Sequence, residues 1–594
     1  MNAREADILI NILNNPFSNQ RSLAEETGYS LGIINRTLHS LAGAGFLDDE
    51  FHPTAKAREA IGEASPRNAV ILAAGFGMRM VPINLTAPKA MLEVHGEALI
   101  ERQIRQLQEA GIRDITVVVG FMKESFEELI DRYGVKLIVN REYAHKNNLS
   151  SLALTADKIS NTYIIPADVW CRRNPFSRHE LYSWYMVTDT KNAESTVRLN
   201  RKMELAEVTD RRDGNTMIGI SYLTGQEAKT VRERIRLFSR NPAYDQEFWE
   251  SALYENGKMI VHGRLAHAAD VVEINTYEQL RELDGESSYL KSDALDVIAE
   301  VFHTSPEKIV NIEVLKKGMT NRSFLFTVDH RKYIMRIPGE GTNELINREQ
   351  EAEVFRTISG CGLCDDPVYL NPENGYKITL FLDEVRVCDP ESEDDQKKCI
   401  NKLREFHGMH LTVGHTFDIF EQIGFYESLW QGQASAYRDY RTTKANVLAL
   451  QPVIDRQKKD WCLTHIDAVP DNFLFYTENG EEKLQLTDWE YSGMQDPHVD
   501  IAMFCIYSLY DKEQTDHLID LYFDGACSRS TRMKIYCYVA ACGLLWSNWC
   551  EYKRILGVEF GEYSLRQYRY AKDFCRYARE IMTADDTEAI KENA

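Results

Sequence analysis

The spacing of hydrophobic residues divides the chain into three blocks, the first of which is helical. Apolar residues recur at helical intervals over Asp7–Leu13 and again over Leu31–Leu41, with Pro16 breaking the chain between them. Ser30 directly precedes the second stretch and is a candidate N-cap. Residues 1–64 are therefore predicted to fold as short helices.

A different rhythm begins after Ser65–Asn68, which we interpret as a linker. Short apolar strands such as Val70–Leu72 and Ile115–Val119 alternate with helices such as Ala98–Ala110. This alternation predicts a mostly parallel α/β sheet, with ligands at the carboxyl ends of its strands. A polar run, Asp284–Ser288, suits a second linker.

The third block combines a few strands with a long helical remainder. Strands are predicted at Ser323–Val328 and Lys332–Ile337, and a helix follows around Glu344–Ile358. Beyond Cys399 the pattern is mainly helical. The predicted domains are 1–64, 68–284 and 290–594, in an α/β plus α+β arrangement.

Amino-acid composition and net charge exclude several classes of protein. A hydrophobic content of 44% and a charged content of 27% are ordinary for a folded chain of 594 residues. No stretch reaches the ~18 apolar residues of a membrane span, and the first residues lack a secretory signal, so we expect a cytoplasmic protein. The 12 cysteines are too sparse for a disulfide scaffold. A formal net charge of −22 argues against nucleic acid as the main partner.

The first block resembles a winged helix-turn-helix, with a small wing starting at Phe46–Asp48. It holds five Lys or Arg residues against nine Asp or Glu residues. Because DNA binding needs several cations to neutralise phosphates, a docking or regulatory role is favoured over autonomous DNA binding.

A glycine-containing turn after the strand Val70–Leu72 carries the first candidate chemistry. Ala73, Ala74, Gly75 and Gly77 can bring backbone N–H groups close to a phosphate chain, and Arg79 adds a cation. Lys89, in Pro88–Leu92, can neutralise charge at an α-phosphate during its displacement.

This composite motif resembles the sugar-nucleotide and phosphocholine nucleotidyltransferase family over residues 68–284. The resemblance implies a Rossmann-like α/β domain that uses CTP, with Asn148 and Ser150 near the nucleotide. A helix-capping loop is the alternative interpretation of this asparagine segment.

Asp168 follows a buried strand, where a carboxylate can hold Mg²⁺ against a triphosphate. The resemblance implies a second ligand at Asn275, where the phosphocholine branch more usually has an aspartate. A turn residue is the alternative interpretation of Asn275. The implied reaction is the attack of a phosphate monoester on the α-phosphorus of CTP. Positioning of the substrates and neutralisation of charge would supply most of its rate acceleration.

A second candidate site is signalled by Leu463–Phe473. Asp467, followed five residues later by Asn472, matches a kinase catalytic loop, in which the aspartate accepts the substrate hydroxyl proton and the asparagine holds Mg²⁺. Asp488 follows the strand Leu484–Thr487 and is the predicted second metal ligand.

The upstream strands supply the expected nucleotide contacts of a kinase. Gly318–Ser323 is predicted to cover the phosphates of ATP, with Ser323 among the contacts, and Arg336 replaces the usual strand lysine. Glu351 is the favoured acidic partner of Arg336, with Glu349 as the alternative. On charge alone these side chains could also form a solvated helix face.

The third block resembles the bacterial choline kinases, which share their fold with aminoglycoside phosphotransferases. The resemblance implies that Asp500 braces the catalytic loop. It also implies that Trp546 and Trp549 enclose a quaternary ammonium, with Tyr491 closing the cage and Glu490 balancing the charge. A core stripe of the helix is the alternative for the two tryptophans.

Together the two resemblances imply a bifunctional enzyme that needs Mg²⁺, ATP and CTP. It would phosphorylate choline and then convert phosphocholine into CDP-choline and pyrophosphate. The alternatives are the same activities on ethanolamine or another amino alcohol, an aminoglycoside kinase half, or a transcriptional regulator that senses choline or nucleotides.

Overall fold

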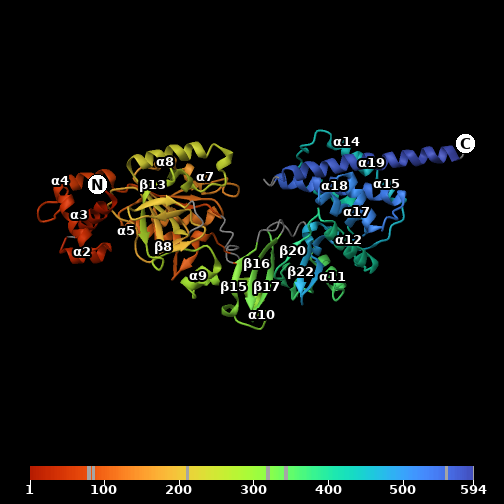
Figure 1. Cartoon of the computed structure of the whole chain (residues 1–594), viewed down its shortest axis with the longest axis horizontal. Helices are drawn as coiled ribbons and strands as arrows, with labels where there is room; N and C mark the ends of the chain where they lie inside the picture. The colour runs from red at the N-terminus through yellow and green to blue at the C-terminus, as the bar shows by residue number, and fades with distance from the viewer. Residues whose placement is uncertain are drawn as a thin grey trace. The chain divides into compact units, whose positions relative to one another are not determined.

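The computed structural model describes residues 1–15, 17–75, 80, 82, 87–208, 213–315, 321–339, 346–555 and 560–592, with the side chains of Ser288 and of residues 584–592 excepted. The chain forms two compact units, Met1–Val314 and Leu315–Ala594. Figure 1 shows the helices and strands of both units. In the described parts of the chain, no helix has both the length and the apolar composition of a membrane span.

The first unit begins with helices, as the sequence predicted. These are α1 (Ala3–Asn14), α2 (Gln20–Thr27), α3 (Leu31–Gly43) and α4 (Ala55–Ala64), with an antiparallel bridge between Leu47 and Pro53. Asn19 caps α2 by accepting from the backbone N–H groups of Arg21 and Ser22. Ser30 stands at the N-cap of α3 but makes no side-chain capping hydrogen bond.

The helices pack on the following domain through polar contacts. Asp7 accepts hydrogen bonds from the Tyr29 hydroxyl at 2.8 Å and from the Tyr182 hydroxyl at 2.6 Å. The Asn161 amide donates to the backbone carbonyls of Glu63 and Ser65. The N-terminal helices are therefore tied to the α/β domain at both of their ends.

The α/β domain is built on one large sheet whose two halves differ in strand direction. The strands β1 (Asn68–Ala73), β4 (Asp114–Val119), β5 (Lys136–Val139) and β6 (Thr162–Pro166) pair in parallel. The next strand, β11 (Gly214–Leu223), is antiparallel to β6 and to β8 (Trp184–Asn192). Beyond β8, the parallel neighbour β13 (Lys258–Ala266) is followed by the antiparallel β10 (Glu204–Glu207) and β9 (Val197–Leu199).

The expectation of a mostly parallel sheet is thus correct only for its first half. Parallel neighbours need long crossover connections, usually helical, whereas antiparallel neighbours can follow each other directly. Between β8 and α8 (Gly225–Phe238) the described chain contains strands but no helix, so these strands pair antiparallel.

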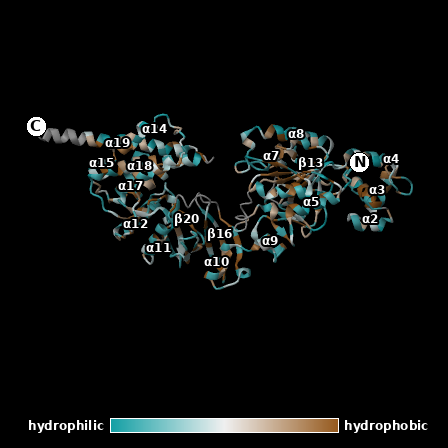
Figure 2. Cartoon of the chain, turned by 180° about the vertical axis from the view of Figure 1, so that it is seen from behind, coloured by the Kyte–Doolittle hydropathy of each residue, from teal (hydrophilic) through white to brown (hydrophobic). Residues whose placement is uncertain are grey.

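Helices cover both faces of this sheet because the strand residues alternate in direction. Ile71 belongs to a core shared with α5 (Leu99–Glu109), whereas Val70 belongs to a second core shared with α7 (Asn148–Ala153) and α8. In Figure 1, α7 and α8 lie on the same side of β8. Figure 2 shows hydrophobic residues concentrated on the strands and hydrophilic residues on the outer helix surfaces.

The predicted linker after the α/β domain is bonded to that domain. Asp284 accepts from the backbone N–H of His95 at 2.6 Å, and the Ser287 hydroxyl donates to the Glu93 carbonyl at 2.8 Å. The helices α9 (Tyr277–Leu283) and α10 (Asp293–Val301) and the strand β15 (Val310–Val314) also belong to the first unit.

The second unit opens with antiparallel strands and one long helix. The strands β16 (Asn321–Val328), β17 (Arg331–Pro338), β19 (Lys377–Leu380) and β18 (Tyr369–Leu370) are neighbours in that order. Arg336 pairs with Ser323 on one side and with Lys377 on the other. Helix α11 spans Arg348–Ile358, and residues 344 and 345 of the predicted helix lie outside the described residues.

The remainder of this unit is mainly helical, as predicted. Two short antiparallel pairings flank residues 465–472, namely β22 (Phe473–Glu478) with β23 (Glu481–Leu486) and β21 (Cys462–Thr464) with β24 (Gly493–Gln495). Helix α18 (Arg529–Ile555) is buried along most of its length and packs on α19 (Glu562–Glu592). The other helices are α12 (Glu393–Gly408), α13 (Ile419–Ser428), α14 (Tyr440–Leu448), α15 (Gln451–Asp455), α16 (His498–Tyr507) and α17 (Lys512–Tyr522).

Candidate active sites

The first site lies at the carboxyl ends of the parallel strands. Ala73 ends β1, and Ala74 and Gly75 follow it. The Ala74 carbonyl accepts from the backbone N–H of Phe121 at 3.2 Å, which ties the turn to the end of β4. The predicted phosphate contacts Gly77 and Arg79 lie outside the described residues.

Three predicted residues meet at this edge although they are far apart in sequence. The ammonium of Lys89 lies 2.5 Å from Asp168 Oδ2 and 2.7 Å from Asn275 Oδ1. Lys89 begins a short 3₁₀ helix, Lys89–Met91. The strand β7 (Val169–Cys171) pairs antiparallel with β14 (Val271–Glu273), so Asp168 and Asn275 leave adjacent strand ends.

The backbone around Asn275 is held in place by the start of α9. The N–H groups of Asn275 and Thr276 both donate to Gln279 Oε1, and Thr276 caps the helix in return. Ile274 N–H donates to the Asp168 carbonyl at 3.0 Å. The amide of Asn275 is therefore fixed beside the carboxylate of Asp168.

The oxygens of this site suit a hard divalent cation. Asp168 Oδ1 is buried and has no hydrogen-bond partner, which leaves one carboxylate oxygen available. Mg²⁺ is commonly held by one or two protein oxygens together with substrate phosphates. The described residues contain no group of three or more His, Cys, Asp or Glu side chains that could hold a metal by themselves.

Asn148 and Ser150 are engaged in holding the loop before α7. Asn148 Oδ1 accepts from the backbone N–H of Trp249 at 2.8 Å. The Ser150 hydroxyl donates to the Asn147 carbonyl at 2.8 Å and accepts from Asn140 Nδ2 at 3.2 Å. Asn147 caps α7 with its side chain, as the alternative interpretation expected.

Sequence reasoning missed a buried carboxylate in this domain, Glu250. Its Oε1 accepts from the Tyr185 hydroxyl at 3.0 Å, and its Oε2 is buried without a partner. Burial raises the pKa of Glu250 to about 7, and the charge of Glu273 contributes in the same direction. The sequence signal was the neighbouring Trp249, which the structure places in the core together with Tyr185.

The second site is organised around the catalytic-loop motif. Asn472 Nδ2 donates to the Asp467 carbonyl at 2.8 Å and to Asp467 Oδ2 at 3.1 Å. The backbone N–H of Thr487 donates to the Asn472 carbonyl at 2.9 Å, which brings the next residue, Asp488, to the same place. The backbone of Asp488 is in the left-handed region, with φ of 67°.

Three carboxylates, Asp467, Asp488 and Glu490, lie close together at this loop, and the pKa values of the two aspartates are raised. Burial, then the charges of Asp488 and Glu490, raises the pKa of Asp467 to about 8. Burial and the Glu490 charge raise the pKa of Asp488 to about 6, against the opposing effect of Lys377 and Arg336. A positive charge beside these carboxylates would relieve their repulsion.

Asp500 braces the loop, as the resemblance implied. Its carboxylate accepts from the backbone N–H groups of His465 at 3.0 Å and Ile466 at 2.7 Å. The backbone of Ile466 is left-handed, with φ of 72°, a strained conformation for a β-branched residue. A buried histidine, His407, contacts Asp500 Oδ2 at 2.9 Å from the other side.

Arg336 is paired with Glu351, as predicted, and not with the alternative Glu349. Its guanidinium donates to both carboxylate oxygens of Glu351, at 2.5 and 2.9 Å. Glu351 is buried, whereas Glu349 is exposed. Sequence reasoning missed two further cations, Arg348 at 3.0 Å and Lys377 at 3.6 Å from the same carboxylate.

Glu490 faces the same group of cations. Its Oε2 accepts from Asn321 Nδ2 at 3.0 Å and lies 3.5 Å from Arg348 and 3.9 Å from Arg336. The structure thus places Glu490 between the cations and the catalytic-loop carboxylates. Ser323 lies on β16 directly opposite Arg336.

The predicted cage residues form a continuous series of aromatic contacts. Tyr491 meets Trp546 edge to face at a centroid distance of 6.1 Å, and Trp546 meets Trp549 at 5.5 Å. Both tryptophans are largely buried, at 9% and 4% exposure. The series continues from Trp549 to Phe560 at 5.1 Å and on to Tyr563.

The far end of this series returns to the catalytic loop. Tyr563 meets Tyr507 at 5.8 Å, and the Tyr507 hydroxyl donates to Asp471 at 2.9 Å. Burial first, and then neighbouring negative charges that include Asp467, raises the pKa of both tyrosines. Phe560, Tyr563 and Tyr507 are thus further aromatic residues of the site that the sequence motif did not reveal.

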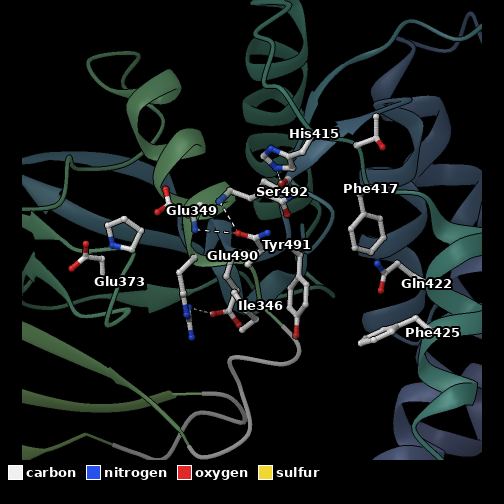
Figure 3. A pocket seen from close by; sticks show the side chains of 15 residues that line it. Ile346, Glu349, Glu373, His415, Phe417, Gln422, Phe425, Glu490, Tyr491 and Ser492 are labelled. Carbon is white, nitrogen blue, oxygen red and sulfur yellow. Dashed lines mark hydrogen bonds and ion pairs between the residues drawn. The ribbon is translucent and has the colours of Figure 1, made fainter.

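A cavity of about 600 Å³ opens beside Tyr491 and the start of α11. Figure 3 shows Glu349 and Glu373 on one side of it and Phe417 and Phe425 on the other. The cavity therefore combines acidic and aromatic walls next to Tyr491.

Comparisons with known proteins match both halves of the chain. The family model Choline/ethanolamine kinase matches residues 312–530, and the model MobA-like NTP transferase domain matches residues 69–179. A choline-phosphate cytidylyltransferase from Streptococcus pneumoniae is 31% identical over 220 residues, which are 36% of this chain and 96% of that protein. A 2-aminoethylphosphonate cytidylyltransferase from Lancefieldella rimae is 30% identical over 243 residues, 38% of this chain and 96% of that protein.

The solved structure of the choline kinase LicA from Streptococcus pneumoniae is 28% identical in sequence to this chain. The match covers 48% of this chain and 100% of the LicA chain, with a TM-score of 0.42. The MobA-like model covers Lys89 and Asp168, which the structure brings together. The chain therefore belongs to the choline-phosphate cytidylyltransferase family and joins to it a choline/ethanolamine kinase domain, which makes it an enzyme with two transferase domains.

Proposed function

We propose that the chain phosphorylates choline with ATP and then transfers CMP from CTP to the phosphocholine, giving CDP-choline and pyrophosphate. The observation that carries the proposal is the presence of residues suited to two transferase reactions in one chain. Asp467, Asn472 and Asp488 supply one set, and Lys89 and Asp168 belong to the other. The product of the first reaction is the substrate of the second.

In the kinase reaction, Asp467 accepts the proton of the choline hydroxyl as the oxygen attacks the γ-phosphorus of ATP. Asn472 orients Asp467 through the two hydrogen bonds that it donates. Asn472 and Asp488 would hold Mg²⁺, which supplies charge neutralisation at the ATP phosphates. Arg336, held by Glu351, contributes a positive charge from β17.

In the cytidylyl transfer, the phosphate of phosphocholine is already ionised and needs no strong general base. Lys89 neutralises charge at the α-phosphate of CTP, and the turn Ala73–Gly75 brings backbone N–H groups to the phosphates. Asp168 and Asn275 would hold the Mg²⁺ of this site. Gly77 and Arg79, which lie outside the described residues, are predicted to add phosphate contacts. Positioning of the two substrates supplies most of the remaining rate.

Recognition of choline rests on the aromatic series beside Asp467. A trimethylammonium group cannot donate hydrogen bonds, so aromatic faces and nearby carboxylates are its suitable partners. Tyr491, Trp546 and Trp549 supply such faces, and Glu490 adds negative charge. In the transferase domain, the buried Glu250 beside Tyr185 is a counter-charge for the same cation on phosphocholine.

The second candidate acceptor is an amino alcohol with a primary ammonium, such as ethanolamine. Two findings favour it: the matching kinase family includes ethanolamine kinases by its description, and one relative transfers CMP to 2-aminoethylphosphonate by its name. The two acceptors are separated by Trp546→Ala, which is expected to raise the KM for choline at least tenfold and to change the KM for ethanolamine less. Trp461→Ala, at an exposed tryptophan, is the matched control.

The N-terminal helices form a winged helix-turn-helix that serves docking or regulation. This proposal is supported by the helices α1, α2 and α3, by the bridge between Leu47 and Pro53, and by α4. On α3, the Arg36 guanidinium donates to the Gly32 carbonyl, and Asn35 accepts from Gln20. Binding of promoter DNA in a gel shift at physiological salt would instead favour a regulator that senses choline or nucleotides.

One experiment tests the main proposal. The purified chain is incubated with choline, ATP, CTP and Mg²⁺, and phosphocholine, CDP-choline and pyrophosphate are followed by ³¹P NMR. Asp467→Asn is expected to stop phosphocholine formation, and CDP-choline then forms only when phosphocholine is supplied. Lys89→Met is expected to stop CDP-choline formation only. Asp455→Asn and Lys136→Met, at exposed ion pairs, are the matched controls. Absence of both phosphorus products with the parent chain would refute the proposal.

A further inference from the structure

The ammonium of Lys89 lies where the cation of the transferase site is expected. It contacts Asp168 Oδ2 at 2.5 Å and Asn275 Oδ1 at 2.7 Å, the two side chains that would hold Mg²⁺. The Lys89 side chain is only 13% exposed and that of Asp168 only 22%. A partly buried lysine thus uses the oxygens that a metal ion would need.

The charges of the three side chains favour this arrangement in the absence of nucleotide. Asp168 carries one negative charge and Asn275 none, so one ammonium already neutralises the pair. A divalent cation that joined them would lie beside the Lys89 ammonium, and like charges at such short range repel strongly where water is partly excluded. The Asn275 side chain is neutral, so it supplies no second negative charge that would offset this repulsion.

A nucleoside triphosphate changes this balance because it brings several negative charges. The Lys89 ammonium then has an alternative partner in the phosphates, and the oxygens of Asp168 and Asn275 become available. Asp168 Oδ1, which is buried without a partner, is a further oxygen that the lysine does not use.

We propose that Lys89 is a resident counter-cation that keeps divalent metal off Asp168 and Asn275 until a nucleoside triphosphate arrives. Metal and nucleotide therefore load together, and Lys89 moves from the metal ligands to the phosphates as they do. This inference rests on the proposed cytidylyl transfer for the location of the metal, but it concerns binding before any reaction.

The test measures Mn²⁺ binding by water-proton relaxation, which reports protein-bound metal. The full chain carries Asp488→Asn so that the kinase site contributes little, and no nucleotide is present. Lys89→Met is expected to bind Mn²⁺ at least tenfold more tightly than this background, which corresponds to ~1.4 kcal/mol. Lys136→Met, which removes a lysine paired with Asp114 at 2.8 Å, is expected to leave Mn²⁺ binding unchanged.

A second variant keeps the lysine and changes the charge of the ligand pair. Asn275→Asp is expected to tighten Mn²⁺ binding at least tenfold in the absence of nucleotide, because two carboxylates then face one ammonium. Equal Mn²⁺ affinities for the background and Lys89→Met, or for the background and Asn275→Asp, would overturn the proposal. Because the readout needs no turnover, a chain that makes no CDP-choline could still pass this test, so the two failures are distinguishable.

Discussion

Replacing Glu351 by glutamine is expected to loosen helix α11 because three buried cations converge on this one carboxylate. Arg336 contacts it at 2.5 Å, Arg348 at 3.0 Å and Lys377 at 3.6 Å. Burial alone would raise the pKa of Glu351, but Lys377, Arg336 and Arg348 outweigh it and lower the pKa to about 2. The carboxylate is therefore strongly favoured in its charged form.

The size of the effect follows from this lowered pKa. A fall from 4.5 to about 2 corresponds to about 3 kcal/mol of differential stabilisation at neutral pH, since each pKa unit is worth ~1.4 kcal/mol. The same magnitude is typical when one partner of a buried ion pair is removed. Because the folded-state pKa is lowered, the contribution is complete above pH 4.5 and is lost as the pH falls toward 2.

Hydrogen exchange of α11 in the full chain is the suitable assay, because a chain of several domains does not unfold in two states. Opening of residues 348–358 in Glu351→Gln is expected to be up to ~100-fold more frequent than in the parent, which corresponds to about 3 kcal/mol. The ratio should shrink when the pH is lowered below 4. Glu349→Gln, on the same helix but exposed, is the matched control. Exchange within threefold of the parent would refute the energetic argument.

Three further outcomes are expected. Asp467→Asn should leave cytidylyl transfer from supplied phosphocholine unchanged, which a coupled pyrophosphate assay checks; a parallel loss would contradict independent sites. Gly543→Ala should destabilise the helical part of the second unit by ~1–3 kcal/mol, because its Cβ would lie 2.7 Å from Tyr570 Cβ; an unchanged thermal transition would count against this packing. Glu250→Gln should stabilise the first unit above pH 7, where the raised pKa means that folding must accommodate a buried charge, and should weaken phosphocholine binding; a loss of stability at pH 8 would contradict this account.

Local patterns in the sequence predicted most of the elements and the pairing of motif residues. The strands around Val70 and Val117 and the helix around Ile104 were predicted because buried apolar residues recur with the period of each element. The antiparallel half of the large sheet was not predicted, because strand direction depends on pairing between distant segments. No local spacing distinguishes a strand that pairs in parallel from one that pairs antiparallel.

The difference between local patterns and contacts between distant segments also separates the predicted site residues from the missed ones. Asp467, Asn472 and Asp488 were predicted because their chemistry is confined to one short stretch of sequence. Arg348 and Lys377 were missed, although each contacts Glu351, because a charged residue near a helix or on a strand usually faces solvent. Only the register of β17 and β19, with Arg336 opposite Lys377, brings the latter into the site.

An acidic protein that handles anionic nucleotides must keep its cations in place without letting them attract every phosphate. Both sites do this by pairing: Lys89 lies on Asp168, and Arg336 lies on Glu351. A phosphate chain therefore gains less binding free energy from each of these paired cations than it would from an unpaired cation. The reason is that the phosphate competes with a carboxylate that already contacts the cation. Binding then depends on the whole set of contacts, including the metal that enters with the nucleotide, so a net charge of −22 and the use of ATP and CTP are compatible.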